Sequence, residues 1–544
     1  MTVFKNIVIQ YDEKMEETRV AGMHDVWNRA MIISDTGVPD EIRGRKIAVI
    51  KSASALEREL CAIRQQSDKD NVKVMEYVNS VLGIAQFYKE QKAFENTDKN
   101  LITVDVNNEF IDVCYIRNES GDFSIKKTKR LDCGINDITE WMLESLQYRD
   151  ILKEINDDIQ ETAQIKNQLS KIISNEFLKG YCVKKEFHYV DSFGEQQFIV
   201  LKRQDIMSCI QKLLIAIIES INILLYQEQI KDIVIMLSGK IWLCQEAVQI
   251  LKKRYVTHQI VSYRPEVAAL LGAVTYLNLY AKLDDLCLFE NNYEKMHYKD
   301  IWGRVNRLNQ IQQEGYWKVL QKVIEGKREI LIQGEANDIY DIYSALRIDF
   351  PEICIVWAYD KSSYYTLGTK ESPYVKINLT YKKEGENTLS CIDEKANKIL
   401  KKCVYNYASS SDAEIIRRIY LYISENYYYV KQKNENGEYP DYAYTLETLL
   451  YCGVCHGYAT TLIYLLKKLQ IPIFYVGGDA DGREFGGHAW NMVQIIDGSY
   501  RHMDITWDLE KAQKSKEIGY YLLDDIEMKA RRHFWNVQDY PVCI

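Results

Sequence analysis

Apolar and polar residues alternate in two different ways along the first 280 residues. Short apolar runs that favour β-strands occur at KNIVIQY, RKIAVIK, LITVDV, DVCYIR and DIVIMLSG. Between them, apolar residues recur at helical spacing over 57–67, 135–148 and 205–226. Strands that alternate with helices predict an α/β fold for a first domain, residues 1–280. No internal repeat is visible in the sequence.

A second pattern covers residues 281–394. It begins with a charged stretch of helical periodicity, DIWGRVNRLNQIQQEGYWKVLQKVIEG, and continues with a strand at EILIQG and a helix at DIYDIYSALRID. Three further strands are predicted around EICIVWAYD, SSYYTLG and VKINLTYKK. We interpret this region as a helical connector followed by a small α+β domain.

Residues 395–544 form the third predicted domain, which begins with long helices over 395–407 and 412–431. The segment LYCGVCHGYATTLIYLLKKL, residues 450–469, then repeats apolar residues at helical spacing: Tyr458, Leu462, Leu465, Leu466 and Leu469. The pattern predicts a helix that begins at Cys455 and ends before Pro472. Together the three regions predict a multidomain protein of mixed α/β and α+β class.

Composition and charge exclude some classes of partner. The chain has 544 residues, which is too long for one core and suggests about three or four domains. Apolar residues make up 47% and charged residues 27%, as in a soluble globular protein. The net charge is -9, and no Lys/Arg stripe stands apart from neighbouring acids. We therefore expect no nucleic-acid partner.

The sequence also bears on the compartment. The segment MTVFKNIVIQYDEK lacks the apolar core of an export signal. The most apolar stretch, LLIAIIESINILLY, is interrupted by Glu219, Ser220 and Asn222, so we predict a buried helix and no membrane partner. Thirteen cysteines are scattered singly, and their odd number fits reduced thiols better than a disulfide framework. We predict a cytoplasmic protein.

Cys452 and Cys455 allow three interpretations: half of a metal site, a redox pair, or one nucleophile with a bystander. A structural zinc site needs four ligands, and no second cysteine pair follows, although His456, His488 and His502 lie in the same region. A redox pair normally closes a βα unit near the start of its fold. A helix N-terminus stabilises a thiolate, which favours Cys455 as the nucleophile and Cys452 as a small buried hydrophobe.

A general base can come from GGHAWNMVQIIDGSYRHMDITWD, an apparent hairpin that turns at Asp-Gly. A two-residue turn would place Asp504 and His488 on opposite faces of the sheet. A three-residue loop that ends in a left-handed Gly498 would pair Ile495 with Ser499 instead. Asp504 and His488 would then be diagonal neighbours on one face, close enough for a carboxylate to hold an imidazole. We predict this turn, or a bulge with the same effect.

Three motifs carry a resemblance to a known family. GVCHGYA, GGHAWN and HMDITWD resemble, in this order, the motifs of the transglutaminase-like superfamily, which has a papain-type fold. The resemblance covers residues from about 395 to 510, and the α+β segment before them resembles the lead-in of bacterial members. It implies that Cys455 is the nucleophile, His488 the general base and then acid, and Asp504 the residue that orients the imidazole. Trp490 would line the site.

Two roles in this region stay open. The family's oxyanion donor upstream of the cysteine does not show itself, and Tyr442 and Tyr444 are candidates. His502 would share the sheet face of Asp504, so it is a rival for the role of base.

The first domain carries a second resemblance. LITVDVNNEFIDVCYIRN resembles the second phosphate loop of the actin-like ATPase domain of seventy-kilodalton heat-shock chaperones. Three later segments follow in that family's order: KRLDCGINDITEWMLESL, IKDIVIMLSGKIWLCQEAVQIL and RPEVAALLGAVTYL. The resemblance implies an actin-like fold over residues from about 25 to 280.

The phosphate-binding loops of that family depend on glycines, because backbone N–H groups must close on phosphate oxygens. Here Asn107, Asn108 and Glu109 stand in their place, and the first phosphate loop has no counterpart in MTVFKNIVIQYDEKM. At the adenosine turn one glycine, Gly239, remains beside Ser238. We expect neither ATP hydrolysis nor ATP binding, and interpret the domain as a scaffold that binds a substrate or partner.

The leading hypothesis is a thiol-dependent enzyme that acts on a peptide or isopeptide amide through an acyl-enzyme on Cys455. Bacterial relatives favour a protease or amidase over a protein cross-linker, by analogy alone. The alternatives are a non-catalytic protein-binding module and a nucleotide-regulated chaperone-like protein. GGDADGREFGG, residues 477–487, lacks the closing glutamate of a calcium loop, so we interpret it as a loop that gates the cleft. We predict no cofactor, no metal and a protein or peptide substrate; the sequence does not predict an oligomeric state.

Overall fold

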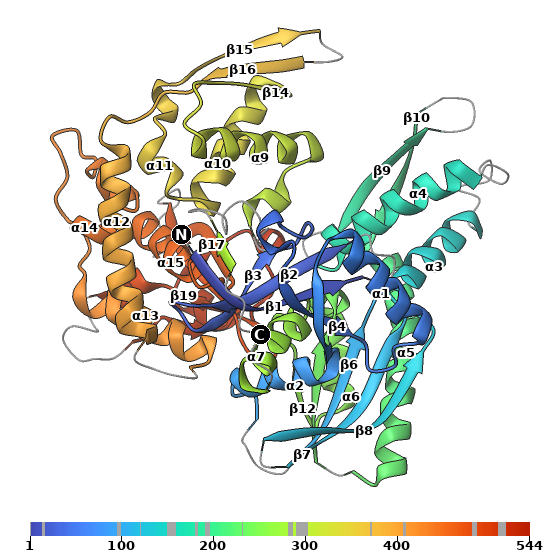
Figure 1. Ribbon diagram of the computed structural model, residues 1–544. Helices are drawn as coiled ribbons and strands as arrows, with labels where there is room; N and C mark the ends of the chain where they lie inside the picture. Colours follow the sequence, from blue (N-terminus) through green and yellow to red (C-terminus); the bar gives the residue numbers. More distant parts are fainter. Residues whose placement is uncertain are drawn as a thin grey trace. The chain divides into compact units, whose positions relative to one another are not determined.

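The computed structural model is a mixed α/β protein with several sheets, in agreement with the predicted class (Figure 1). The chain divides into two compact units: unit 1 is Met1–Tyr298 with Ile496–Gly498, and unit 2 is Lys299–Ile495 with Ser499–Ile544. The structure describes residues 2–12, 17–94, 99–119, 121–148, 159–179, 183–190, 196–230, 232–280, 287–289, 303–369, 373–405, 410–480, 487–509 and 518–544. The three predicted domains remain a prediction.

Unit 1 contains two sheets with the same strand order. The first has the order β3-β2-β1-β4-β5 and the second β8-β7-β6-β11-β12. In each sheet, three strands that are consecutive in the chain pair antiparallel to one another. Two later strands extend the sheet beside the first of these three and run parallel to it. The strands are β1 (Thr2–Tyr11), β2 (Thr18–His24), β3 (Arg29–Ser34), β4 (Lys46–Lys51), β5 (Lys73–Asn79), β6 (Lys99–Val106), β7 (Ile111–Glu119), β8 (Asp122–Leu131), β11 (Ile233–Ser238) and β12 (Gln259–Val261). The repeat is therefore one of topology and not of visible sequence.

Three further strands and seven described α-helices belong to unit 1. The strand β13 (Cys287–Phe289) pairs with the start of β1, and β9 (Lys184–Val190) and β10 (Gln196–Lys202) form a separate hairpin. The α-helices are α1 (Glu57–Lys69), α2 (Ser80–Glu90), α3 (Ile135–Tyr148), α4 (Ile159–Ile172), α5 (Arg203–Glu228), α6 (Gln245–Arg254) and α7 (Ala268–Tyr280). Helices α2 and α7 cross at Gly83 and Gly272, where a Cβ on Gly272 would lie 1.8 Å from the Gly83 carbonyl oxygen. Only glycine permits this approach.

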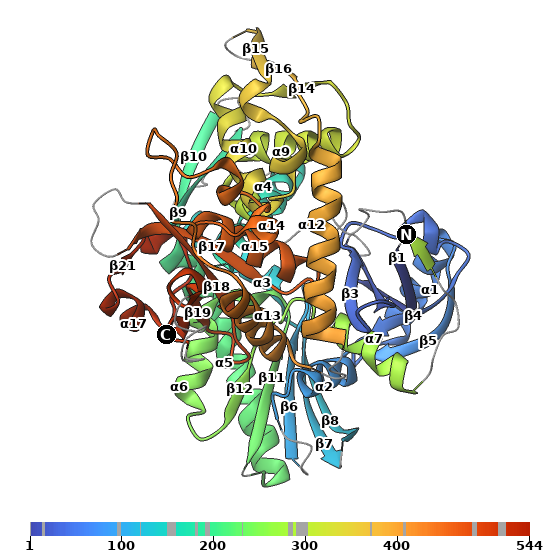
Figure 2. The same cartoon turned by 90° about the vertical axis from the view of Figure 1, so that its left-hand side faces the viewer.

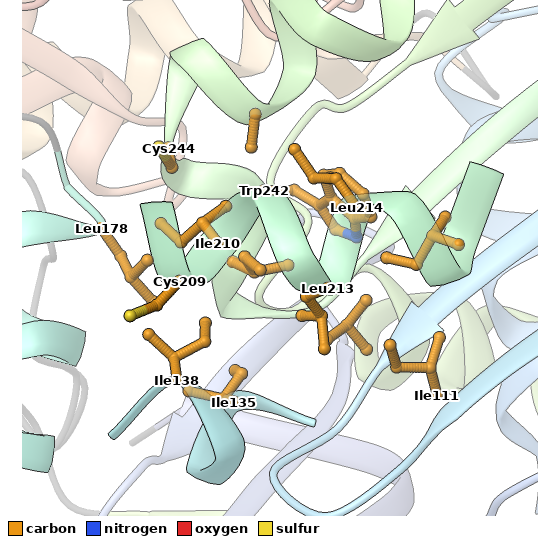
Figure 3. Close-up of a cluster of buried hydrophobic side chains, with 14 of the residues drawn as sticks. Ile111, Ile135, Ile138, Leu178, Cys209, Ile210, Leu213, Leu214, Trp242 and Cys244 are labelled. Carbon is orange, nitrogen blue, oxygen red and sulfur yellow. The ribbon is translucent and has the colours of Figure 1, made fainter. Parts of the chain in front are cut away.

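The long apolar helix α5 lies in the core of unit 1. Ile210 and Leu213 of this helix lie near Ile138 of α3 and Trp242, in a cluster that also includes residues of β6 and β7 (Figure 3). By length and composition alone α5 could cross a membrane. One of its faces is buried among apolar side chains, as the sequence predicts.

The first part of unit 2 is a three-stranded sheet covered by helices. Its order is β14-β16-β15, with β14 (Glu329–Gln333), β15 (Ser363–Gly368), β16 (Pro373–Asn378), α9 (Gln310–Ile324), α10 (Ala336–Asp349) and α11 (Ile353–Val356). The predicted strand at EICIVWAYD is wrong, because its centre is the helical turn α11. Pro351 precedes that turn, and a fixed φ without an N–H suits a helix start. Residues 300–302 of the predicted helical stretch lie outside the described residues. Its α-helix begins only at Gln310, because a 3₁₀ turn at Arg304–Arg307 and a capping Asn309 precede it.

The rest of unit 2 contains helices beside a five-stranded antiparallel sheet, in which β17, β18 and β19 lie side by side next to α15 (Figure 2). The sheet order is β20-β19-β18-β17-β21. The strands of this sheet are β17 (Ile473–Ala480), β18 (His488–Gln494), β19 (Tyr500–Met503), β20 (Tyr521–Leu523) and β21 (His533–Phe534). The helices of this part are α12 (Gly385–Leu400), α13 (Asp412–Asn426), α14 (Thr448–Tyr451), α15 (Cys455–Lys467) and α17 (Asp525–Ala530).

Two helix boundaries in this part differ from the prediction. Helix α12 begins at Gly385 and not at residue 395. Its first turns are amphipathic, but their many charged residues hide the helical spacing of the apolar ones in the sequence. Helix α13 ends at Asn426 and not at residue 431, because Tyr427 is extended there. Its start is sharper: Ser411 and Glu414 form a reciprocal capping box.

Candidate active site

Cys455 is the first residue of helix α15, as predicted. Its thiol is partly exposed and lies at the end of the helix where free N–H groups and the helix dipole stabilise an anion. Close packing fixes this start: a Cβ on Gly457 would lie 2.4 Å from the Ala443 carbonyl oxygen. The preceding helical turn ends at Cys452, which is buried and has a left-handed φ of 74°. The two cysteines are both free thiols.

The predicted three-residue turn after β18 is confirmed. The Ile495 N–H donates to the Ser499 carbonyl at 2.9 Å, and Gly498 has a left-handed φ of 83°. The ladder between β18 and β19 continues this register, with Asn491 opposite Met503. Because side chains alternate along strands, the next pair on the hairpin brings Asp504 to the face of the sheet that carries His488.

His488 and Asp504 form a short, buried ion pair. The distance from His488 Nε2 to Asp504 Oδ2 is 2.6 Å, within the range of a charge-assisted hydrogen bond. Burial opposes protonation of the imidazole, but the Asp504 carboxylate and the Cys455 thiol outweigh it and raise the pKa of His488 to about 10. Burial likewise opposes ionisation of Asp504, yet His488 and His533 hold the pKa of that carboxyl well below its usual range.

The other carboxylate oxygen of Asp504 is also occupied. Asp504 Oδ1 accepts from the backbone N–H of Thr506 at 3.0 Å and from its hydroxyl. These bonds belong to the short 3₁₀ turn Ile505–Trp507, which Asp504 caps. The capping turn leaves Oδ2 free to face the histidines.

Two side chains interact with the Cys455 thiol. The thiol helps to raise the pKa of His488, so the imidazole interacts with both the thiol and the Asp504 carboxylate. The Tyr429 hydroxyl is the second, because Cys455 also influences the pKa of that tyrosine. Burial, and then the neighbouring thiol, raise the pKa of Tyr429, so its hydroxyl keeps a proton to donate.

Tyr429 reaches this position because its backbone forms a parallel bridge with Gly453, two residues before the nucleophile. The Val430 N–H donates to the Gly453 carbonyl at 3.0 Å and continues the bridge. Of the two tyrosines proposed from the sequence, Tyr444 lies within electrostatic reach of Cys455, whereas the Tyr442 ring packs against Tyr451. Tyr429 is therefore a candidate oxyanion donor, although the sequence did not single it out.

Two tryptophans enclose the histidine. Trp490 is buried and stacks on the His488 ring, with ring centroids 5.8 Å apart and an interplanar angle of 26°. Trp507 Nε1 lies 3.2 Å from His488 Nε2, and its ring meets the imidazole edge-on. The buried Trp490 ring lowers the local polarity around the imidazole, which strengthens its bond to Asp504. Trp490 was expected to line the site; Trp507 was not singled out.

The other histidines of the region lie outside this arrangement. His502 is fully buried, accepts from Trp490 Nε1 at 3.0 Å and bonds to Asp525 at 3.0 Å. Burial lowers the pKa of His502, and its ring is occupied, so it does not serve as the base. His456 follows the nucleophile, but burial, and then the Arg347 guanidinium, lower the pKa of His456 to about 3.

Among the described residues, two groups have ligand atoms close enough to be considered for a metal ion: His488, Asp504 and His533, and His502, Asp525 and Cys543. Neither includes Cys452 or Cys455. The loop interpreted as a gate over residues 477–487 is wrong in its first part, because residues 477–480 are the end of strand β17 and pair with β18 and β21. Residues 481–486 lie outside the described residues.

A cysteine at a helix start, together with a histidine bonded to a carboxylate, is the set of groups that papain-like cysteine enzymes use. Residues 398–505 match the transglutaminase-like superfamily, so this part of the chain is a transglutaminase-like domain. Members of that superfamily are usually cysteine-dependent enzymes. The match includes Cys455, His488 and Asp504, and it ends before His533. A search of curated proteins finds no match to the chain.

A separate pocket lies in unit 1. It is lined by residues from the two segments likened to nucleotide-binding loops, among them Asp105, Asn107 and Gly239. Lys240 and Glu17 form an ion pair at 2.7 Å at this pocket. A Cβ on Gly239 would lie 2.2 Å from the Val106 carbonyl oxygen, so the glycine serves the packing of the two strands here.

Proposed function

We propose that unit 2 is a papain-like thiol enzyme that acts on a peptide or isopeptide amide through an acyl-enzyme on Cys455. One observation carries the proposal: the imidazole of His488 is bonded at 2.6 Å to a buried carboxylate, and the Cys455 thiol is near enough to help raise the pKa of His488 to about 10. An imidazole held in this way can keep the thiol ionised and later supply a proton. A buried structural cysteine would need no such pairing.

The proposed reaction has two stages. The Cys455 thiolate attacks the amide carbonyl, and the resulting oxyanion accepts hydrogen bonds from the Cys455 N–H and the Tyr429 hydroxyl. The His488 imidazolium then donates its proton to the departing amine as the C–N bond breaks. In the second stage His488 removes a proton from water, which attacks the thioester and releases Cys455. An amine in place of water would give cross-linking; we favour hydrolysis, by analogy with the superfamily alone.

The test is alkylation of the two neighbouring cysteines by iodoacetamide, followed by peptide mass spectrometry. Cys455 is expected to react at least about tenfold faster than Cys452 at pH 7, because only Cys455 lies at a helix start beside an imidazolium. Since the pKa of His488 is raised to about 10, the imidazolium persists up to that pH and the Cys455 rate should change little between pH 7 and 9. An ordinary thiol gains about tenfold or more over that range.

The Cys452→Ala variant should keep this behaviour, and Cys455→Ala should abolish it. Slow labelling of Cys455, equal to that of Cys452 and rising with pH in the same way, would remove the enzyme proposal.

For unit 1 we propose a degenerate actin-type domain that no longer hydrolyses ATP and binds a substrate or partner. The repeated strand order supports the actin-like assignment, since both sheets place three antiparallel and two parallel strands in the same sequence. The Lys240–Glu17 pair and Asn107 at the pocket support the loss of phosphate binding, because the cation is already neutralised.

Millimolar ATP with Mg²⁺ is expected to leave the thermal unfolding temperature of the whole chain unchanged, because a ligand raises it only by binding the folded state. Differential scanning fluorimetry measures this, with ADP as a second ligand. A rise of several degrees would support the alternative, a nucleotide-regulated chaperone-like protein.

A further inference from the structure

His533 is a second histidine on the Asp504 carboxylate, 29 residues beyond it in the chain. It belongs to the short strand β21, which pairs with the end of β17. Its ring is fully buried. The distance from His533 Nε2 to Asp504 Oδ2 is 2.8 Å, so His488 and His533 contact the same oxygen. The two imidazole centroids are 5.4 Å apart.

Both ring nitrogens of His533 face oxygen atoms that can only accept hydrogen bonds. Nε2 faces the Asp504 carboxylate, and Nδ1 lies 3.1 Å from the backbone carbonyl oxygen of Arg531. A neutral imidazole has one N–H and one lone pair, so it can satisfy only one of these partners. The other contact would then set two lone pairs against each other in a buried place, which is costly.

The remaining surroundings of His533 are mostly aromatic. The rings of Trp490, Trp507 and Tyr520 lie 5.2, 5.6 and 5.6 Å from its centroid. The nearby groups that can carry charge are Asp504, His488, His502 and the Arg531 side chain. His502 is held neutral between Trp490 and Asp525, and the Arg531 guanidinium donates to the Gly519 carbonyl.

We propose that His533 is a positioning residue that carries a proton on both ring nitrogens and thereby holds Asp504 ionised and directed at His488. This inference rests on the proposed function of the same site. The Asp504 carboxylate then lies between two imidazolium ions, His488 and His533, and accepts a charge-assisted hydrogen bond from each. Buried charges are stabilised when such hydrogen-bonded partners of opposite sign lie beside them.

A metal ion at His488, Asp504 and His533 is the competing interpretation. Zinc bonds of about 2.0–2.1 Å at tetrahedral angles set ligand atoms about 3.3 Å apart. Here the nitrogen-to-oxygen distances are 2.6 and 2.8 Å, and both histidines contact one oxygen. These distances are those of hydrogen bonds to a charged acceptor and leave no room for an ion between the atoms.

The first test is ¹⁵N NMR of the imidazole nitrogens in the whole chain, in which the His533 signals are assigned by their loss in His533→Gln. The chain has eight histidines, so this assignment is practicable. Both His533 nitrogens are expected at protonated shifts at pH 7. A neutral ring at pH 7, or one equivalent of zinc that a chelator removes, would overturn the proposal. This readout does not depend on whether Cys455 reacts, so it separates failure of this proposal from failure of the proposed function.

The second test is the pH profile of Cys455 alkylation. In His533→Gln the amide can still donate to Asp504, but the positive charge is gone. The nearby His488 and Cys455 should then hold their protons more tightly, and both limbs of the profile should move to higher pH by about one unit. His502→Gln is the matched control, since His502 is equally buried and bonds to Asp525 instead of Asp504. It should leave the profile in place. An unchanged profile in His533→Gln would contradict the charge role, because a purely structural contact predicts lost stability without such a shift.

Discussion

Replacement of Asp504 with asparagine is expected to slow the reaction of Cys455 with iodoacetamide at pH 7 by about 10–30-fold, because the thiol would return to the few per cent of thiolate that an ordinary cysteine has at this pH. Asp504 accepts from four donors: two imidazoles and both donors of Thr506. Asparagine would turn an NH₂ group toward one of these pairs. Its neutral side chain would also remove the charge that keeps His488 protonated, and with it the partner of the thiolate.

The same variant should lose stability. Removal of the carboxylate leaves buried imidazolium charge without its partner, and such losses cost about 3–5 kcal/mol. Urea denaturation followed by circular dichroism measures this change, and the alkylation rate is compared only under conditions in which the variant is folded.

Asp525→Asn is the matched control for Asp504→Asn. Asp525 also accepts from a buried histidine, His502 at 3.0 Å, but that pair does not touch the thiol. Its asparagine variant can still accept that bond, so alkylation of Cys455 should stay within about twofold of the wild-type rate. If both variants slowed Cys455 equally, the effect would be a general disturbance of the sheet, and the assignment of Asp504 would fail.

Those parts of the site that depend on distances along one hairpin could be predicted from the sequence. The position of Asp504 relative to His488 follows from strand alternation and the number of residues in the turn. A three-residue turn is the simplest arrangement that puts both side chains on one face, and the Ile495–Ser499 bond confirms it. The start of α15 at Cys455 was equally accessible, because apolar spacing and helix-end signals are local.

The parts that depend on contacts between distant segments could not be predicted in this way. Tyr429 is one of three consecutive tyrosines, and only the bridge from its backbone to Gly453 selects it for the nucleophile. His533 follows the recognisable motifs, and no spacing signal links it to Asp504. It reaches the carboxylate because β21 pairs with β17, and a two-residue strand is too short to leave a pattern in the sequence.

The repeated topology of unit 1 was hidden for a related reason. The two sheets share strand order and direction, but the side chains that fill their faces differ. The turn after β6 carries Asn107 and Asn108, whereas β1 is followed by Asp12. A fold can keep its topology while its residues diverge, since many apolar combinations fill the same space. Only the pairing of strands in space makes the repeat visible.

Tyr429→Phe should separate the two kinds of reaction that Cys455 can undergo. Acylation by p-nitrophenyl acetate passes through a tetrahedral oxyanion, so removal of the Tyr429 hydroxyl is expected to slow it by about 10²–10³-fold. Alkylation by iodoacetamide displaces iodide and forms no oxyanion. Its rate should stay within about threefold of the wild-type value, because His488 and the helix start still stabilise the thiolate.

Tyr444→Phe is the control for this split. The Tyr444 hydroxyl is also within electrostatic reach of Cys455, whereas the backbone bridge to Gly453, two residues before the nucleophile, is formed by Tyr429. It should therefore alter neither rate by more than about threefold. A fall in both rates of Tyr429→Phe would make Tyr429 a support for the thiolate and not an oxyanion donor. If neither the acylation rate nor the alkylation rate of Tyr429→Phe changed, the backbone N–H alone would be the oxyanion donor. A group that does not stabilise the transition state does not alter the barrier.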